Sequence, residues 1–250
     1  MDNSGLAFEA AQILTNSQGV SAQTRRIGDV KITDVRVNAE AAAKIGKREG
    51  RYITLHGEPH AAGMTALLHR AILQLIPPRG RLFAAGLGNP DITPDRLGAA
   101  VVRTRAVSGK KGARYSLAAI ETDVAARTGV ETARLVKAAA RELRADCVIA
   151  VDALSCCDPR YIGKTVQISS AGIAPGSGAG ARHNGDRREL SPELLGRPVA
   201  SVGVPTVTAL SSVTHSPADR DFLITTSDID TIINMWAEVI GGAIDSVVGE

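Results

Sequence analysis

Aromatic side chains are scarce in this chain: Phe, Trp and Tyr make up 3% of its 250 residues, while hydrophobic residues make up 44%. A core with so few aromatic rings has to be built from Val, Ile, Leu and Ala, which is typical of a parallel sheet flanked by helices. The same scarcity argues against a surface that stacks the bases of single-stranded nucleic acid. A chain of this length buries roughly 70–75% of its unfolded surface on folding. The composition therefore predicts one large α/β domain.

Cysteine and metal-binding patterns are also sparse. The three cysteines, Cys147, Cys156 and Cys157, are too few and too clustered for a disulfide framework or a structural zinc site. None of the five histidines has the spacing of a metal ligand set. A thiol nucleophile at the Cys156–Cys157 pair is disfavoured because no histidine lies nearby in the sequence. We expect no metal, no cofactor and a reducing, cytoplasmic compartment.

Long apolar runs and charge blocks are missing as well. The N-terminus has no basic region followed by an apolar run, so we expect neither a signal peptide nor a membrane span. The net charge is +3 and the basic residues are scattered along the chain, which favours a solvated surface. We expect neither nucleic acid nor a membrane as a direct partner.

One stretch combines the end of a strand with the start of a helix. The apolar run Leu82–Ala85 predicts a buried strand, which ends at the glycine-rich turn Gly86–Asn89. Thr93 is a suitable N-cap, Pro94 suits the first helical position, and Asp95 then falls in the first helical turn. In open α/β sheets, ligands bind at such carboxyl ends of strands. The stretch therefore marks a candidate site.

A second apolar run also ends on a carboxylate. Residues Cys147–Val151 predict a strand whose carboxyl end presents Asp152. A carboxylate in such a place is costly unless it is used or paired. If this strand lies beside Leu82–Ala85, Asp152 and Asp95 face one cleft. Two carboxylates in one cleft can supply the general acid and base of a hydrolysis.

The remaining segments give weaker signals. The glycine-rich segment 172–180 is either a surface loop or a cradle whose N–H groups hold a peptide backbone or an anion. We expect residues 1–27 to be an N-terminal processed or linker segment, with a linker at Ser17–Arg26, and residues 28–250 to form a single domain. The final helix is expected to begin at Ser227 as N-cap.

Several short motifs follow one another along the chain in an order and at spacings that together match one family. They are Gly86-Leu-Gly-Asn89, Thr93-Pro-Asp95-x-Leu-Gly98, Thr128-Gly-Val-Glu-Thr132, Val151-Asp-Ala-Leu154, Gly172-Ile-x-Pro-Gly-Ser-Gly-x-Gly180 and Gly203-Val-Pro-Thr-Val207. This set resembles the spore germination protease family over nearly the whole chain. The resemblance implies a three-layer αβα sandwich with a mixed, mostly parallel sheet, similar to that of the hydrogenase-maturation peptidases.

The resemblance also implies a function. It implies an endopeptidase of the spore core cytoplasm that degrades small acid-soluble spore proteins during germination, is made as a zymogen and forms a homo-oligomer, a tetramer. The family's two catalytic aspartates map by motif onto Asp95 and Asp152, which act on a water without a metal. We expect substrate contacts from the turn and the glycine-rich segment, at Gly88, Asn89, Gly176, Ser177 and Gly178.

If both aspartates are catalytic, we expect them to have different roles. A helix N-terminus favours the charged form of Asp95, the base, and desolvation favours the neutral form of Asp152, the acid. Only Met1–Gly5 precede the segment that matches the start of the processed enzyme, so we expect activity without removal of a long pro-segment. Two alternatives remain open: a metal-dependent maturation peptidase of the same fold, and an inactive paralogue that binds spore proteins.

Overall fold

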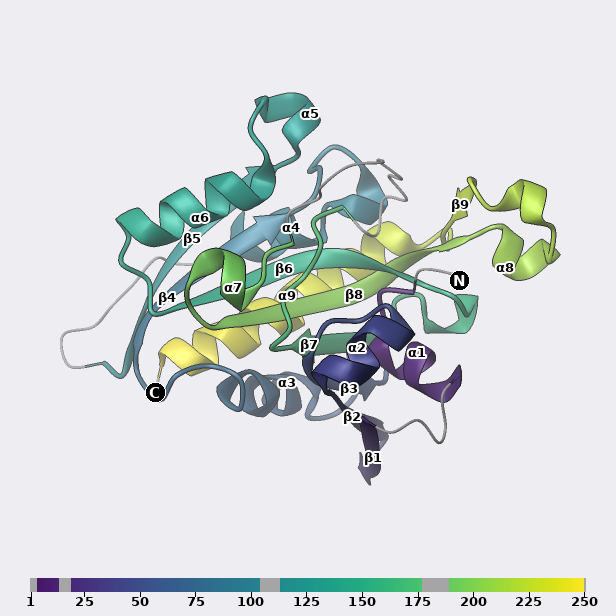
Figure 1. The fold of residues 1–250 in the computed structure, drawn as a ribbon, viewed down its shortest axis with the longest axis horizontal. Coiled ribbons are helices and arrows are strands. Elements are labelled where there is room, and N and C mark those ends of the chain that lie inside the picture. The colour runs from purple at the N-terminus through teal and green to yellow at the C-terminus, as the bar shows by residue number, and fades with distance from the viewer. Residues whose placement is uncertain (1–3, 14–18, 104–112, 177–188, 250) are drawn as a thin grey trace.

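The computed structural model describes residues 4–13, 19–103, 113–176 and 189–249. These residues form an α/β structure around one nine-stranded mixed sheet (Figure 1). The spatial order of the strands is β1 (Val20–Ile27), β2 (Val30–Val37), β3 (Gly50–His56), β7 (Thr165–Ser169), β8 (Val199–Ala209), β6 (Cys147–Cys156), β4 (Gly80–Leu87) and β5 (Tyr115–Asp123), and β9 (Leu223–Ile224) pairs with β8. The α/β class predicted from the composition is confirmed.

The sheet is mixed, as expected, but it is not mostly parallel. Only the pairings β8–β6, β6–β4 and β4–β5 are parallel, while the other described pairings are antiparallel. The difference arises at the N-terminal side, where β1, β2 and β3 join the row through β7. The parallel half nevertheless contains the predicted pair of neighbours, β4 and β6.

Helices cover both faces of the sheet (Figure 1). They are α1 (Ala7–Ile13), α2 (Ala39–Ile45), α3 (Met64–Leu73), α4 (Leu97–Arg103), α5 (Ala125–Thr128), α6 (Thr132–Glu142), α7 (Pro192–Leu195), α8 (Ser211–Thr214) and α9 (Ile229–Val248), with short 3-10 turns η1 (Thr93–Asp95), η2 (Pro159–Tyr161) and η3 (Pro217–Asp219). In the view of Figure 1, α7 lies in front of the strands and α9 behind them. Helix α9 packs against α3 and α4 on that rear face.

Helix α9 is the longest described helix. Its length and apolar composition alone would suffice to cross a membrane, but Trp236, Ile240 and Ile244 are completely buried, as in a core helix. The helix begins at Ile229 with Asp228 in the N-cap position and no side-chain capping bond. The predicted cap at Ser227 is therefore wrong by one residue.

The predicted linker at Ser17–Arg26 is wrong from Val20 onward, because Val20–Ile27 pairs along its whole length with β2, while Ser17 and Gln18 lie outside the described residues. Almost every side chain of β1 is exposed, so the strand carries no apolar alternation that would reveal it in the sequence. The preceding segment docks on the sheet: Gly5 N–H donates to Ser155 O at 2.8 Å, and Ala7 N–H donates to Gln167 Oε1 at 2.7 Å. Processing of residues 1–27 and the domain boundary at residue 28 stay predictions.

Candidate functional site

The site lies where strands β4 and β6 part. The two strands are paired from Leu82 and Cys147 as far as Gly86 and Val151. Beyond Val151, β6 continues beside β8, while the 3-10 turn η1 packs against β6. Asp152 is the first residue of β6 past the last pair, and Asp95 is the last residue of η1. The fold therefore brings the two predicted aspartates to the same break in the sheet.

Glycines allow this close approach. A Cβ atom on Gly98, at the start of α4, would overlap both Leu87 N and Val151 O. A Cβ on Gly88, whose φ is +96°, would overlap the main-chain oxygen of Asp95. The motif glycines thus let η1 and α4 pack directly on the ends of β4 and β6.

Asp152 is completely shielded from solvent, with 0% of its surface exposed. Its Oδ1 accepts the N–H of Ala153 at 2.9 Å, and its Oδ2 accepts the N–H of Gly176 at 3.2 Å. Burial raises the pKa of this carboxyl well above its usual range, and the negative charge of Asp95 raises it further. The two N–H bonds oppose this rise. Asp152 is therefore the member of the pair that favours the neutral, protonated form.

Asp95 is 3% exposed and its surroundings differ. Its Oδ2 accepts the N–H of Asn89 at 2.7 Å, while its Oδ1 is buried and has no hydrogen-bond partner among the described residues. Burial raises the pKa of Asp95, the Asn89 N–H lowers it, and the charge of Asp123 raises it. Burial and the neighbouring charge raise the pKa of Asp152 well above its usual range, whereas Asp95 is less strongly affected, so Asp95 is the better carrier of the negative charge.

The predicted helix start at Thr93 is a 3-10 turn instead. Ile92 holds the N-cap position without a side-chain bond, and α4 begins only at Leu97. Asp95 is thus not in the first turn of an α-helix. Its charge is favoured by one specific amide, that of Asn89, rather than by a helix N-terminus.

The structure describes three of the five predicted substrate-binding residues, Gly88, Asn89 and Gly176. The N–H of Asn89 donates to Asp95 and the N–H of Gly176 donates to Asp152, so both hold the carboxylates in this structure. Gly88 makes room for the main chain of Asp95. Ser177 and Gly178 lie outside the described residues. Substrate contacts at these positions stay predictions.

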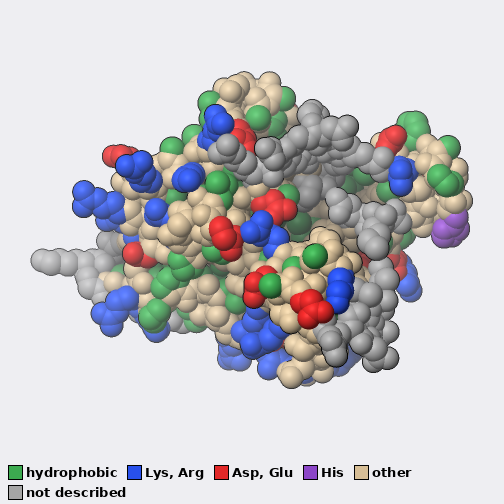
Figure 2. Space-filling view, viewed as in Figure 1, with side chains coloured by type: hydrophobic (Ala, Val, Ile, Leu, Met, Phe, Trp, Pro, Cys, Tyr) green, Lys and Arg blue, Asp and Glu red, His purple; other side chains and the backbone are tan. Residues whose placement is uncertain are grey.

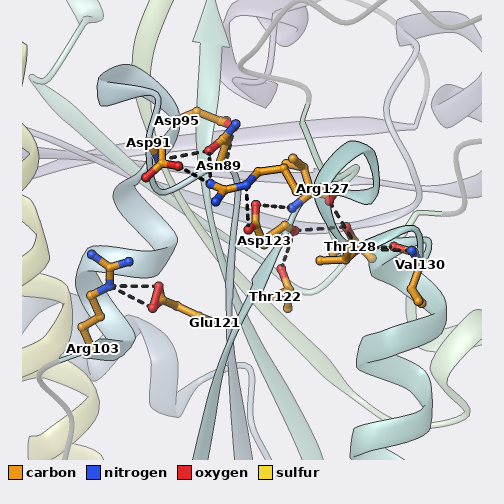
Figure 3. Close-up of polar contacts among 12 residues, drawn as sticks. Asn89, Asp91, Asp95, Arg103, Glu121, Thr122, Asp123, Arg127, Thr128 and Val130 are labelled. Atoms are coloured by element: carbon orange, nitrogen blue, oxygen red, sulfur yellow. Dashed lines mark hydrogen bonds and ion pairs between the residues drawn. The ribbon is translucent and has the colours of Figure 1, made fainter.

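Figure 3 shows a polar network beside Asp95 that the sequence did not reveal. Arg127, in α5, reaches Asn89 Oδ1 at 3.2 Å, Asp91 Oδ2 at 2.5 Å and Asp123 Oδ2 at 3.3 Å. No sequence motif links Arg127 to Asn89, because only the pairing of β4 with β5 brings the two loops together.

The described residues include no metal-binding cluster, and neither of two hollows in the surface is lined by the aspartates. Among these residues, no three His, Cys, Asp or Glu side chains are grouped so that they could hold a metal ion. Two hollows, of about 230 Å³ and 500 Å³, are lined by other residues of the described chain. Figure 2 shows basic side chains at several separate places on one face, with acidic side chains between them, in keeping with a solvated charged surface.

Comparison with known proteins gives a consistent result. A family model described as germination protease matches residues 7–227. The germination protease of Geobacillus sp. (strain WCH70) is 34% identical over 224 residues, covering 81% of this chain and 59% of that protein. That of Priestia megaterium is 33% identical over 246 residues, covering 86% and 65%. That of Clostridium tetani is 31% identical over 252 residues, covering 90% and 76%.

The first two of these relatives are longer proteins, and the chain spans less than two thirds of each. The matched region nevertheless includes both aspartates, the glycines that surround them and the loop that carries Arg127.

Proposed function

Because the chain belongs to the germination protease family, we propose that it is an endopeptidase that hydrolyses small acid-soluble spore proteins during germination. We assign the catalysis to Asp95 and Asp152 acting on one water molecule. The observation that supports this assignment best is the pair itself: two buried carboxylates at one break of the sheet, one of which retains an oxygen, Asp95 Oδ1, without a partner.

The proposed reaction uses the different surroundings of the two groups. Two coupled carboxyls share one proton, which here resides on Asp152. Asp95 Oδ1 accepts a proton from water, whose oxygen attacks the carbonyl carbon of the scissile peptide. Protonated Asp152 donates a hydrogen bond to the carbonyl oxygen in this step. When the tetrahedral intermediate collapses, Asp152 gives its proton to the leaving amine and the C–N bond breaks. The proton that Asp95 took from water then becomes the shared proton of the pair again.

A peptide cannot reach these carboxylates in the arrangement described, since both are shielded from solvent. The N–H of Gly176 lies directly on Asp152. We therefore infer that the substrate displaces the Gly176 amide from Asp152 and takes over its hydrogen bond. Substrate binding and exposure of Asp152 are then one event.

One experiment tests the proposal. Purified protein is incubated with an acid-soluble spore protein, with and without a chelator, and the fragments are mapped by mass spectrometry. Internal cuts that persist in the chelator support the proposal. Activity that is lost on chelation and restored by one divalent ion supports the metal-dependent alternative. Binding without cleavage supports the inactive paralogue.

By the same family relationship we propose a cytoplasmic location in the spore core and a homo-oligomer, a tetramer. Light scattering coupled to gel filtration measures the mass directly. The mass of a single 26.0 kDa chain at micromolar concentration would contradict the oligomer while leaving the proposed chemistry untouched.

A further inference from the structure

Arg127 joins the loop that follows β4 to the loop that follows β5 (Figure 3). Its Nη1 donates to Asn89 Oδ1 at 3.2 Å and to Asp91 Oδ2 at 2.5 Å, while its Nε lies 3.3 Å from Asp123 Oδ2. The planar fork of a guanidinium can hold acceptors from separate loops in fixed directions, which a lysine ammonium does less well. Arg127 is therefore the bridge between the two loops.

Asn89 connects Arg127 to Asp95, because it contacts both residues. The side chain of Asn89 is fixed twice, because its Oδ1 accepts from Arg127 and also from Asp91 N–H at 3.0 Å. The main-chain N–H of the same residue donates to Asp95 Oδ2 at 2.7 Å. Fixing the Asn89 side chain thus fixes the amide that stabilises the charged form of Asp95.

Arg127 also pairs with Asp123, the acidic residue whose charge acts on Asp95. The charge of Asp123 raises the pKa of Asp95, and the guanidinium of Arg127 pairs with Asp123. Among the described residues, the other charged groups packed around η1 are as follows. Asp91 pairs with Arg127, Asp152 faces η1 from β6, and Asp230 of α9 is paired with Arg96, while β8 carries no titratable residue.

We propose that Arg127 is a positioning residue of the aspartate pair, which holds the Asn89 amide against Asp95 and so keeps Asp95 the charged member. The inference rests on the proposed function, because it assigns Asp95 the role of base.

The test compares Arg127→Gln, which removes the charge and the fork, with Arg127→Lys, which keeps the charge. Without Arg127, the charge of Asp123 is uncompensated and the Asn89 amide is no longer held, and both changes raise the pKa of Asp95. Since the base must be deprotonated, the acidic limb of the kcat–pH profile should move to higher pH. Arg127 is 43% exposed, so solvent screening limits the expected move to about half a pH unit, with a smaller move for Arg127→Lys. KM should change little.

The substitution Asp123→Asn should lower the pKa of Asp95, because it removes a charge that raises it. Asp123 has φ +57°, a conformation that Asn also adopts, and the Asn side-chain oxygen can still accept the Val124 N–H. This substitution alone should move the limb to lower pH. Combined with Arg127→Gln, it should bring the limb back toward the wild-type position, since the uncompensated carboxylate is gone.

Arg103 offers a matched control. It is another exposed arginine in the same region, paired with Glu121 at 2.8 Å, and the described contacts do not connect it to Asn89 (Figure 3). Arg103→Gln should leave the acidic limb in place. An unmoved limb in Arg127→Gln, or an equal move in both variants, would overturn the inference.

A second measurement separates this inference from the proposed function. Carboxyl-carbon NMR of protein labelled at aspartate follows the titration of Asp95 without any substrate, with the signal assigned by its loss in Asp95→Asn. The titration should move to higher pH in Arg127→Gln and stay in Arg103→Gln. If the protein cleaves spore proteins but this titration does not move, only the role of Arg127 is wrong. If the titration moves but no cleavage occurs, only the proposed function is wrong.

Discussion

At the scale of single residues, the main feature is a carboxyl that folding drives toward its neutral form. A carboxyl whose pKa is higher in the folded state takes up a proton on folding, so the free energy of unfolding falls as pH rises from the unfolded pKa toward the folded one. Asp152 is such a group. Wild-type protein should therefore lose stability relative to Asp152→Asn as the pH rises above about 4, the usual pKa of an unfolded aspartate, by at most about 1.4 kcal/mol per pH unit for one proton.

Urea unfolding at a series of pH values measures this difference. Asp29→Asn, a change at an exposed position in the turn between β1 and β2, is the control and should follow the wild type throughout. Parallel pH curves for wild type and Asp152→Asn would show that Asp152 is not protonated on folding.

The roles of the two residues can be separated by the leaving group of the substrate. Asp152→Asn keeps a hydrogen-bond donor but cannot protonate an amine, whereas Asp95→Asn removes the base. Both should abolish peptide cleavage, and only Asp152→Asn should keep measurable turnover of an ester whose leaving group needs no proton. Ester turnover that survives in Asp95→Asn but not in Asp152→Asn would reverse the two roles.

At the scale of elements, the contact between α4 and the strands below it depends on glycine. Gly98→Ala should destabilise the fold by roughly 3 kcal/mol or more, because its Cβ would overlap main-chain atoms of both β4 and β6. Gly242→Ala in α9 is the matched control: its Cβ would meet only Thr65 Cγ2, at 3.4 Å, and alanine is the better helix former by about 0.5–1 kcal/mol. Thermal unfolding of both variants measures the contrast, and equal effects would contradict the close packing at Gly98.

The elements also show what the sequence could and could not reveal. Apolar residues recur at helical spacing in the sequences of α3 and α9, because burial of one side of a helix leaves such a pattern. Strand β8 continues past Pro205 to Ala209, and a register shift there leaves Thr206 unpaired with β6. Such a bulge depends on the neighbouring strand and leaves no local signal.

At the scale of the whole molecule, the two aspartates were predictable and their neighbours were not. Asp95 follows the apolar strand β4 and Asp152 follows the apolar run Cys147–Val151, and adjacent parallel strands bring them together. The predicted end of the second strand at Val151 is wrong, because β6 continues beside β8 to Cys156. Asp123 and Arg127 reach the same place only through the β4–β5 pairing. Because their distance from Asp95 in the sequence carries no information on contact, nothing short of the fold could identify them.

The described residues around the aspartates also concern the prediction that cleavage needs no metal ion. It supplies two carboxylates at the site without further His, Cys, Asp or Glu side chains grouped around them in its described part. We expect the rate of spore-protein cleavage to change less than about twofold after exhaustive dialysis against a chelator, because the proposed acid and base are protein side chains. A loss of rate that one added divalent ion reverses would contradict this.

The central claim is that Asp95 and Asp152 together hydrolyse a peptide bond, and one measurement tests it most directly. Equal amounts of wild type, Asp95→Asn, Asp152→Asn and the control Asp29→Asn are incubated with an acid-soluble spore protein, and the fragments are quantified by mass spectrometry. The account predicts identical fragments at similar rates from wild type and Asp29→Asn, and rates at least about 10³-fold lower from the other two. Cleavage at the wild-type rate by either Asp95→Asn or Asp152→Asn would contradict it.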